Sequence, residues 1–128
     1  MRPLVWPAVL LAAAATAGAA TAAAPGAYAL CLRKARTTLE TSGCNAVELR
    51  RVERILDGTY RRLVAGLSPT RRQLLAAAEA RWVAFRDREC DFAASQAAGG
   101  TLEPILHLAC RIRLTVERTA HLERHLRP

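Results

Sequence analysis

The sequence predicts an all-α fold: a small helical bundle of three main helices plus a short N-terminal helix, stapled by two disulfides. Apolar residues recur at helical spacing along most of the chain after residue 25, and no stretch alternates apolar and polar residues for long enough to form a strand. Four cysteines follow an N-terminal segment that has the features of an export signal. A chain of this size buries one modest core, so cross-links would contribute strongly to its stability.

Residues 1–24 have the pattern of a secretory signal peptide, because a short positive start is followed by the apolar run Leu4–Leu11 and then by small residues. The apolar run is too short for a membrane helix. Leu30 stands before Cys31 at a position where a lipoprotein signal needs a small residue. We therefore expect a periplasmic or secreted domain of residues 25–128 that is not a lipoprotein, with the cleavage site left open.

The first half of this domain is expected to form two helices separated by Ser42–Gly43. The first helix is expected over Gly26–Thr41, on apolar residues at helical steps. Asn45 is expected to cap the second helix, with Glu48 as its partner in a capping box, and Gly66 to close it. The expected core stripe of the second helix comprises Leu49, Val52, Leu56 and Leu63, widened by Ile55, Tyr60 and Val64. The opposite side carries Arg50, Arg51, Arg54, Arg61 and Arg62.

The third helix is expected to begin with Ser68 as N-cap and Pro69 as first residue, and to end near Gln96. Trp82 is the only tryptophan after residue 24, and we expect it to anchor the core on a stripe that comprises Ala78, Trp82, Phe85 and Phe92.

A break over Ala97–Gly100 separates the fourth helix, which Thr101 is expected to cap and whose first turn tolerates Pro104. Its expected core stripe is Ile105, Ala109, Ile112 and Val116, widened by Leu108, Leu122 and Leu126.

The four cysteines are Cys31, Cys44, Cys90 and Cys110, and they allow three pairings. We favour Cys31–Cys44 and Cys90–Cys110, because each pair flanks a turn signal and could close a local helical hairpin. Loops of roughly 14 and roughly 21 residues would each contribute about 3 kcal/mol through loop-closure entropy.

The chain is strongly basic, with a formal charge of +8 that falls to +7 when Arg2 is removed with the signal. This balance favours acidic partners, among them anionic envelope polymer and lipid head groups. The acidic residues occur singly along the chain. The aromatic interleaving used by single-strand binders is missing, and the export signal also argues against nucleic acid.

No catalytic residue, cofactor site or metal site is predicted. His121 and His125 are four residues apart on one helical face, but a lone pair near a C-terminus is more typical of a helix-dipole interaction than of a metal site. Arg86–Asp87 is interpreted as an ion pair that orients neighbouring helices. Asp57 and Tyr60 are expected to hydrogen-bond to the third helix as part of the architecture.

Several short motifs run from Cys31 to Leu126. A Leu-Asn-x-x-Tyr element is matched by Leu56 and Tyr60, with Asp57 in place of Asn. A Trp-x-x-Tyr/Phe-Arg-Asp-x-x-Cys signature is matched by Trp82, Phe85, Arg86, Asp87 and Cys90, preceded by Glu79 and Ala80 where the pattern has Gln and Arg. A Gly-Gly-Ser/Thr turn and a Thr-x-x-Arg-x-x-x-Leu tail are matched by Gly99, Gly100, Thr101, Thr115, Arg118 and Leu122.

On these motifs the chain resembles the LprI-like small secreted proteins, a family named for lysozyme inhibition. The resemblance implies an exported helical domain that acts by protein–protein interaction, with a lysozyme or another envelope protein as partner. The residues suggest as an alternative a cationic module that holds anionic envelope polymer or lipid through the Arg-rich second helix. Neither function is enzymatic.

Overall fold

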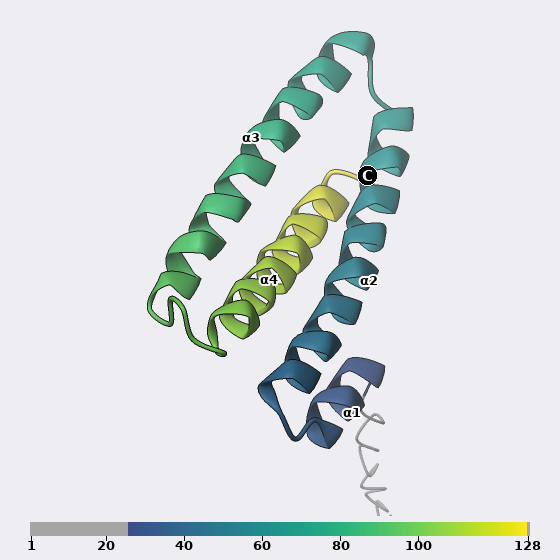
Figure 1. Ribbon diagram of the computed structural model, residues 1–128. Helices are drawn as coiled ribbons and strands as arrows, with labels where there is room; N and C mark the ends of the chain where they lie inside the picture. The colour runs from purple at the N-terminus through teal and green to yellow at the C-terminus, as the bar shows by residue number, and fades with distance from the viewer. Residues whose placement is uncertain (1–25, 128) are drawn as a thin grey trace, which may run out of the picture.

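The computed structural model describes residues 26–127 and contains four helices and, within this range, no strand. They are α1 (Ala27–Lys34), α2 (Thr38–Ala65), α3 (Pro69–Ser95) and α4 (Glu103–Arg124). The long helices α2 and α3 form an antiparallel hairpin, and α4 lies between them (Figure 1). Helix α1 packs against the N-terminal part of α2. The predicted all-α fold, with three main helices and one short one, is therefore confirmed. The predicted signal segment 1–24 lies outside the described residues.

The boundary between α1 and α2 was predicted wrongly. Helix α1 ends at Lys34, and α2 begins after Thr37, whose Oγ1 accepts a hydrogen bond from the Glu40 N–H at 3.1 Å. Glu40 Oε2 accepts in return from the Thr37 N–H at 3.1 Å, which completes a capping box. Ser42–Gly43 does not end a helix, because this local cap starts α2 one turn earlier and the helix continues through Gly43.

Asn45 is also not a helix cap, because it lies inside α2 and is 2% exposed. Its Oδ1 accepts from the Tyr28 hydroxyl at 2.8 Å, and its Nδ2 donates to the Ile105 carbonyl at 3.3 Å. The buried amide thus connects α1, α2 and α4. Its predicted capping partner, Glu48, pairs instead with Arg51 at 2.6 Å.

The turn between α2 and α3 agrees with the prediction. Gly66 closes α2, Ser68 Oγ accepts from the Arg71 N–H at 3.5 Å, and Pro69 is the first residue of α3. Helix α3 ends beside Gln96, as expected.

Thr101, by contrast, does not cap α4, which begins without a side-chain cap and carries Pro104 in its first turn. The Glu103 carboxylate accepts instead from the Gly99 N–H at 2.8 Å. Gly99 has φ +77°, a left-handed conformation that favours glycine.

The core is built around α4 in three apolar clusters. One joins α2 and α4 near α1, a second joins all three long helices, and a third surrounds the disulfide between α3 and α4. Their buried members are Leu49, Val52 and Ile112; Leu56, Leu63 and Leu122; and Cys90, Cys110 and Leu114. The predicted main stripe of α2 is therefore confirmed, although Ile55 is 43% exposed. Trp82 packs against both the second and the third cluster, which confirms its role as anchor.

The predicted stripe of α3 is otherwise wrong. Ala78 is exposed, and Phe85 and Phe92 are 54% and 74% exposed. The residues of α3 that face the bundle include the charged residues Glu79 and Arg86, which apolar periodicity cannot reveal. In α4, Ile112 and Leu122 are buried as expected, and Ile105 and Leu108 are half-buried. Ala109, Val116 and Leu126 are exposed, because the buried face turns toward Leu114, Thr115 and Thr119 instead.

None of the helices within residues 26–127 has the length and apolar character needed to cross a membrane.

Candidate functional site

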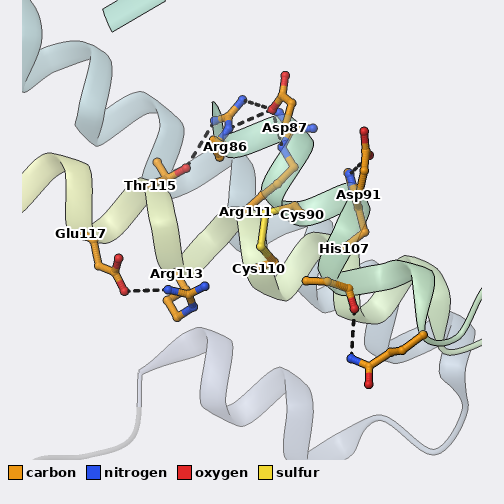
Figure 2. Close-up of a disulfide and its surroundings, with 12 residues drawn as sticks. Arg86, Asp87, Cys90, Asp91, His107, Cys110, Arg111, Arg113, Thr115 and Glu117 are labelled. Carbon is orange, nitrogen blue, oxygen red and sulfur yellow. Dashed lines mark hydrogen bonds and ion pairs between the residues drawn. A yellow bond between two sulfur atoms is a disulfide. The ribbon is translucent and has the colours of Figure 1, made fainter. Parts of the chain in front are cut away.

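Two disulfides join neighbouring helices, in the predicted pairing. Cys31–Cys44 ties α1 to α2, and Cys90–Cys110 ties the end of α3 to the start of α4. Figure 2 shows the second disulfide between α3 and α4. Both of its cysteines are buried, and Cys90 is fully inaccessible. No cysteine of the chain is free.

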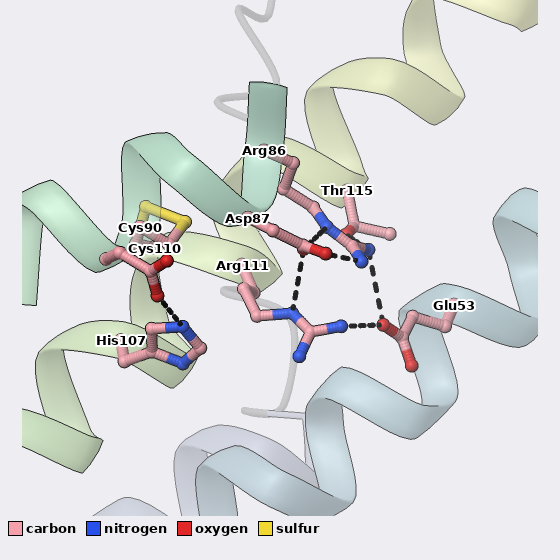
Figure 3. Close-up of polar contacts among 9 residues, drawn as sticks. Glu53, Arg86, Asp87, Cys90, His107, Cys110, Arg111 and Thr115 are labelled. Carbon is pink, nitrogen blue, oxygen red and sulfur yellow. Dashed lines mark hydrogen bonds and ion pairs between the residues drawn. A yellow bond between two sulfur atoms is a disulfide. The ribbon is translucent and has the colours of Figure 1, made fainter. Parts of the chain in front are cut away.

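Arg86 is the centre of a polar cluster that connects the three long helices (Figure 3). The residue is 6% exposed. Its Nη1 lies 3.2 Å from Glu53 Oε1 on α2 and 3.4 Å from Thr115 Oγ1 on α4, and its Nε donates to Asp87 Oδ1 at 3.1 Å. Arg111 on α4 donates to the same Glu53 oxygen at 3.1 Å. This geometry agrees with the interpretation of Arg86 as an ion-pair residue between helices.

Trp82 lies next to this cluster and beneath two guanidinium groups. The Cζ atoms of Arg86 and Arg118 lie 5.2 Å and 5.7 Å from the centre of its ring. Arg118 donates two hydrogen bonds to Glu79 Oε2, at 3.0 Å and 2.8 Å, so its charge is paired in a largely buried setting. Cation–π contacts of this kind contribute about 0.5–2 kcal/mol each. Trp82 thus joins the apolar clusters to the ion pairs.

The other predicted motif residues are mostly structural in their placement. Leu56 is buried and Tyr60 half-buried in the cluster that also contacts Trp82, and Thr115 is fully buried. Gly99 and Gly100 form the turn before α4, where a Cβ on Gly100 would lie 3.2 Å from the Ala97 carbonyl oxygen. Phe85 is the exception, because its ring faces solvent.

Asp57 and Tyr60 do not make the predicted hydrogen bonds to α3 within the described residues. Asp57 is exposed and pairs with Arg61 one turn further along α2, at 2.8 Å. Tyr60 contributes its ring to the apolar core.

The histidines do not assemble a metal centre within residues 26–127, where no group of three or more potential ligands occurs. The rings of His121 and His125 stack with centroids 5.5 Å apart. The pKa of His121 is lowered by desolvation and then by the neighbouring charges of Arg118, Arg124 and His125. A further cation would meet the same repulsion there.

One side of α2 is a basic surface, as predicted, because Arg50, Arg51, Arg54, Arg61 and Arg62 are all exposed. Part of it forms a shallow depression of about 380 Å³ lined by Arg50, Glu53, Arg54 and Asp57. Neither Arg50 nor Arg54 has an ion-pair partner among the described residues.

Two larger grooves lie elsewhere on the molecule. The first, of about 630 Å³, runs between α1 and α2 beside Tyr28 and the Cys31–Cys44 disulfide. The second, of about 650 Å³, lies between the end of α3 and the start of α4, and its lining includes Asp91, Glu103 and His107. Sequence reasoning missed the second groove, because Asp91 and Glu103 are twelve residues apart in the sequence and were interpreted as isolated acids. The absence of Lys and Arg between Arg88 and Arg111 was the available signal.

These features define a class of small all-helical proteins that are cross-linked by two disulfides. The residues of the sequence motif lie mostly in the interior of the bundle. The chain belongs to the LprI family, since the family model described as "Lysozyme inhibitor LprI" matches residues 31–122. It is also 32% identical over 104 residues to an uncharacterized protein of Rhizobium meliloti (strain 1021), in an alignment that covers 71% of this chain and 75% of that relative. No solved structure matches the chain. The family is one of inhibitors, and the two disulfides together with this membership indicate an extracytoplasmic protein.

Proposed function

We propose that this protein is an exported lysozyme inhibitor-like protein that acts by direct protein–protein contact in the periplasm or outside the cell. The observation that carries the proposal is the match to the lysozyme inhibitor family over residues 31–122, which includes both disulfides and the Trp82–Arg86 cluster. Residues 1–24 would serve as the export signal, and export would allow the disulfides to form.

The architecture supports binding rather than catalysis. The convergent charged groups around Arg86 are paired with one another between the helices, so they are engaged in holding α2, α3 and α4 together. The disulfides and the buried ion pairs would hold the surface in one conformation. Preorganisation of this kind lowers the entropy lost on binding and favours an inhibitor that docks as a rigid body.

A turbidity assay with purified residues 25–128 tests the proposal. Oxidised protein is added in increasing molar ratio to a panel of lysozymes acting on bacterial cell walls, and a saturable fall in lysis rate is expected. Protein that has been reduced and alkylated serves as the control, because it should lose the fold and with it the inhibition. Undiminished lysis at large molar excess, for every lysozyme tested, would reject the proposal.

The exposed arginines of α2 favour a second candidate, a module that holds anionic envelope polymer or lipid. Arg50 and Arg54 lie one turn apart on this basic surface without ion-pair partners in the described part of the chain. Co-sedimentation with anionic vesicles or wall polymer should then weaken as salt rises and weaken further in an Arg50→Gln, Arg54→Gln variant. Binding that is absent or independent of salt would exclude this candidate.

A further inference from the structure

The basic residues of the molecule are distributed unevenly along the chain. The stretch from Glu89 to Cys110 contains three acidic residues, Glu89, Asp91 and Glu103, and no Lys or Arg, within a chain of formal charge +8. We call this stretch, which the Cys90–Cys110 disulfide closes at its base, the acidic tip. It comprises the end of α3, the turn and the start of α4, at one end of the bundle (Figure 1).

The acidic tip is hollowed by the groove of about 650 Å³ between α3 and α4. Its lining combines the apolar residues Ala94, Ala98, Pro104 and Leu108 with Asp91, Ser95, Glu103 and His107, and no Lys or Arg lines it in the described part of the chain. Phe92 and Leu102, 74% and 48% exposed, add apolar surface to the same end of the molecule. A cavity with apolar walls and a few polar groups is the usual form of a binding site.

Each carboxylate in the groove contacts a neighbouring group through one oxygen and keeps the other oxygen available. Asp91 Oδ1 lies 3.3 Å from His107 Nε2, and Glu103 Oε2 accepts from the Gly99 N–H at 2.8 Å. Figure 2 labels Asp91 and His107 beside the Cys90–Cys110 disulfide. Asp91 Oδ2 and Glu103 Oε1 have no partner within residues 26–127. The groove therefore offers oriented acceptors to a basic side chain.

We propose that the acidic tip is the surface that contacts the lysozyme, and that its groove receives a Lys or Arg side chain from a basic loop of that enzyme. The inference rests on the proposed function and names the surface that performs it. For a cationic lysozyme, the acidic tip is the part of this basic protein whose charge complements that of the enzyme.

The net charge of the whole molecule does not prevent this contact. Exposed charges farther apart than the Debye length, about 8 Å at physiological salt, are largely screened. The basic residues closest in sequence are Arg88, three residues before Asp91 on α3, and Arg111, which is paired with Glu53 at 3.1 Å. The three carboxylates of the acidic tip therefore outnumber Arg88 beside it, and arginines farther away are largely screened.

The test measures the affinity of the oxidised protein for a cationic lysozyme that it inhibits. Asp91→Lys reverses a charge in the groove, and Ala98→Arg fills the groove from an exposed position. The matched controls are Glu117→Lys, at a carboxylate of similar exposure to Asp91, and Ala120→Arg, at another exposed alanine. Circular dichroism and mass mapping of the disulfides check that each variant keeps its fold.

Each groove variant is expected to raise Kd at least tenfold, and each control to change it less than threefold. Hydrogen exchange of the wild-type complex should show protection within residues 91–108. Groove variants that bind like the wild type, or protection confined to other residues, would overturn the assignment while the proposed function stands. A wild-type protein that neither binds nor inhibits any lysozyme would instead reject the proposed function and the assignment with it.

Discussion

Replacing Arg86 with alanine is expected to lower the free energy of unfolding by about 2–4 kcal/mol. The side chain is 8% exposed and has three polar partners, Glu53, Asp87 and Thr115, besides its contact with the Trp82 ring. Removing one member of a buried ion pair costs about 3–5 kcal/mol when the other is left unpaired. Here the loss is smaller, because Glu53 and Asp87 are 37% and 50% exposed and Glu53 keeps Arg111 as a partner.

Urea unfolding with the disulfides intact provides the assay, followed by circular dichroism and by the fluorescence of Trp82. Arg113→Ala is the control, because Arg113 forms an exposed pair with Glu117 within α4, and such pairs contribute less than about 1 kcal/mol. Arg86→Lys should fall between wild type and alanine, since it keeps the charge and loses the planar donor geometry. If Arg86→Ala and Arg113→Ala lower stability equally, and by less than about 0.5 kcal/mol, the polar cluster does not stabilise the bundle and the reasoning is refuted.

Three further perturbations follow from the local structure. Thr37→Ala should destabilise the protein by about 1 kcal/mol in the same assay, because it removes the side-chain cap of α2, and no change would show that the cap is unimportant. Hydrogen bonds from the Arg36 N–H, and secondarily from the Thr37 N–H, lower the pKa of Glu40. The ionised carboxylate therefore stabilises the fold above its unfolded pKa, and this stabilisation is lost as pH falls through its folded pKa. Glu40→Gln should reduce the loss of unfolding free energy between neutral and acidic pH, and an unchanged pH dependence would contradict this. Replacing Cys90 and Cys110 together with alanine should cost about 3 kcal/mol, measured as a lower urea midpoint, whereas an equal midpoint would mean that the loop is already ordered without the bond.

Much of the fold follows from local chemistry that sequence reasoning can read. The Ser68–Pro69 start of α3 and the Gly66 end of α2 are local signals, and the structure has both. The break before α2 was missed although its signal was equally local. Thr37 and Glu40 form a capping box by themselves, whereas Ser42–Gly43 is only a weak helix terminator that the longer helix absorbs.

Apolar periodicity could not reveal the buried face of α3, because that face includes charged residues. Glu79 and Arg86 face the bundle because each has an oppositely charged partner on another helix, Arg118 and Glu53. A charged residue is expected to face water unless its partner is known, and the partners here are 33 and 39 residues away in sequence. Phe85 and Phe92 were consequently assigned to the core and are exposed.

Most of the family motif lies outside the proposed binding surface, although Gly99, Gly100 and Thr101 form the turn of the acidic tip. Trp82, Arg86, Thr115 and Arg118 are engaged with one another or with neighbouring helices, so a partner protein would meet little of them. A match to the motif therefore identifies the scaffold. The choice of lysozyme would depend on residues that the motif does not specify, such as Asp91 and its neighbours. Exchanging the segment between Cys90 and Cys110 for that of a relative should then transfer the preference for a lysozyme without changing the stability of the polar cluster. If the preference stays with the rest of the chain after such an exchange, the acidic tip does not determine the partner.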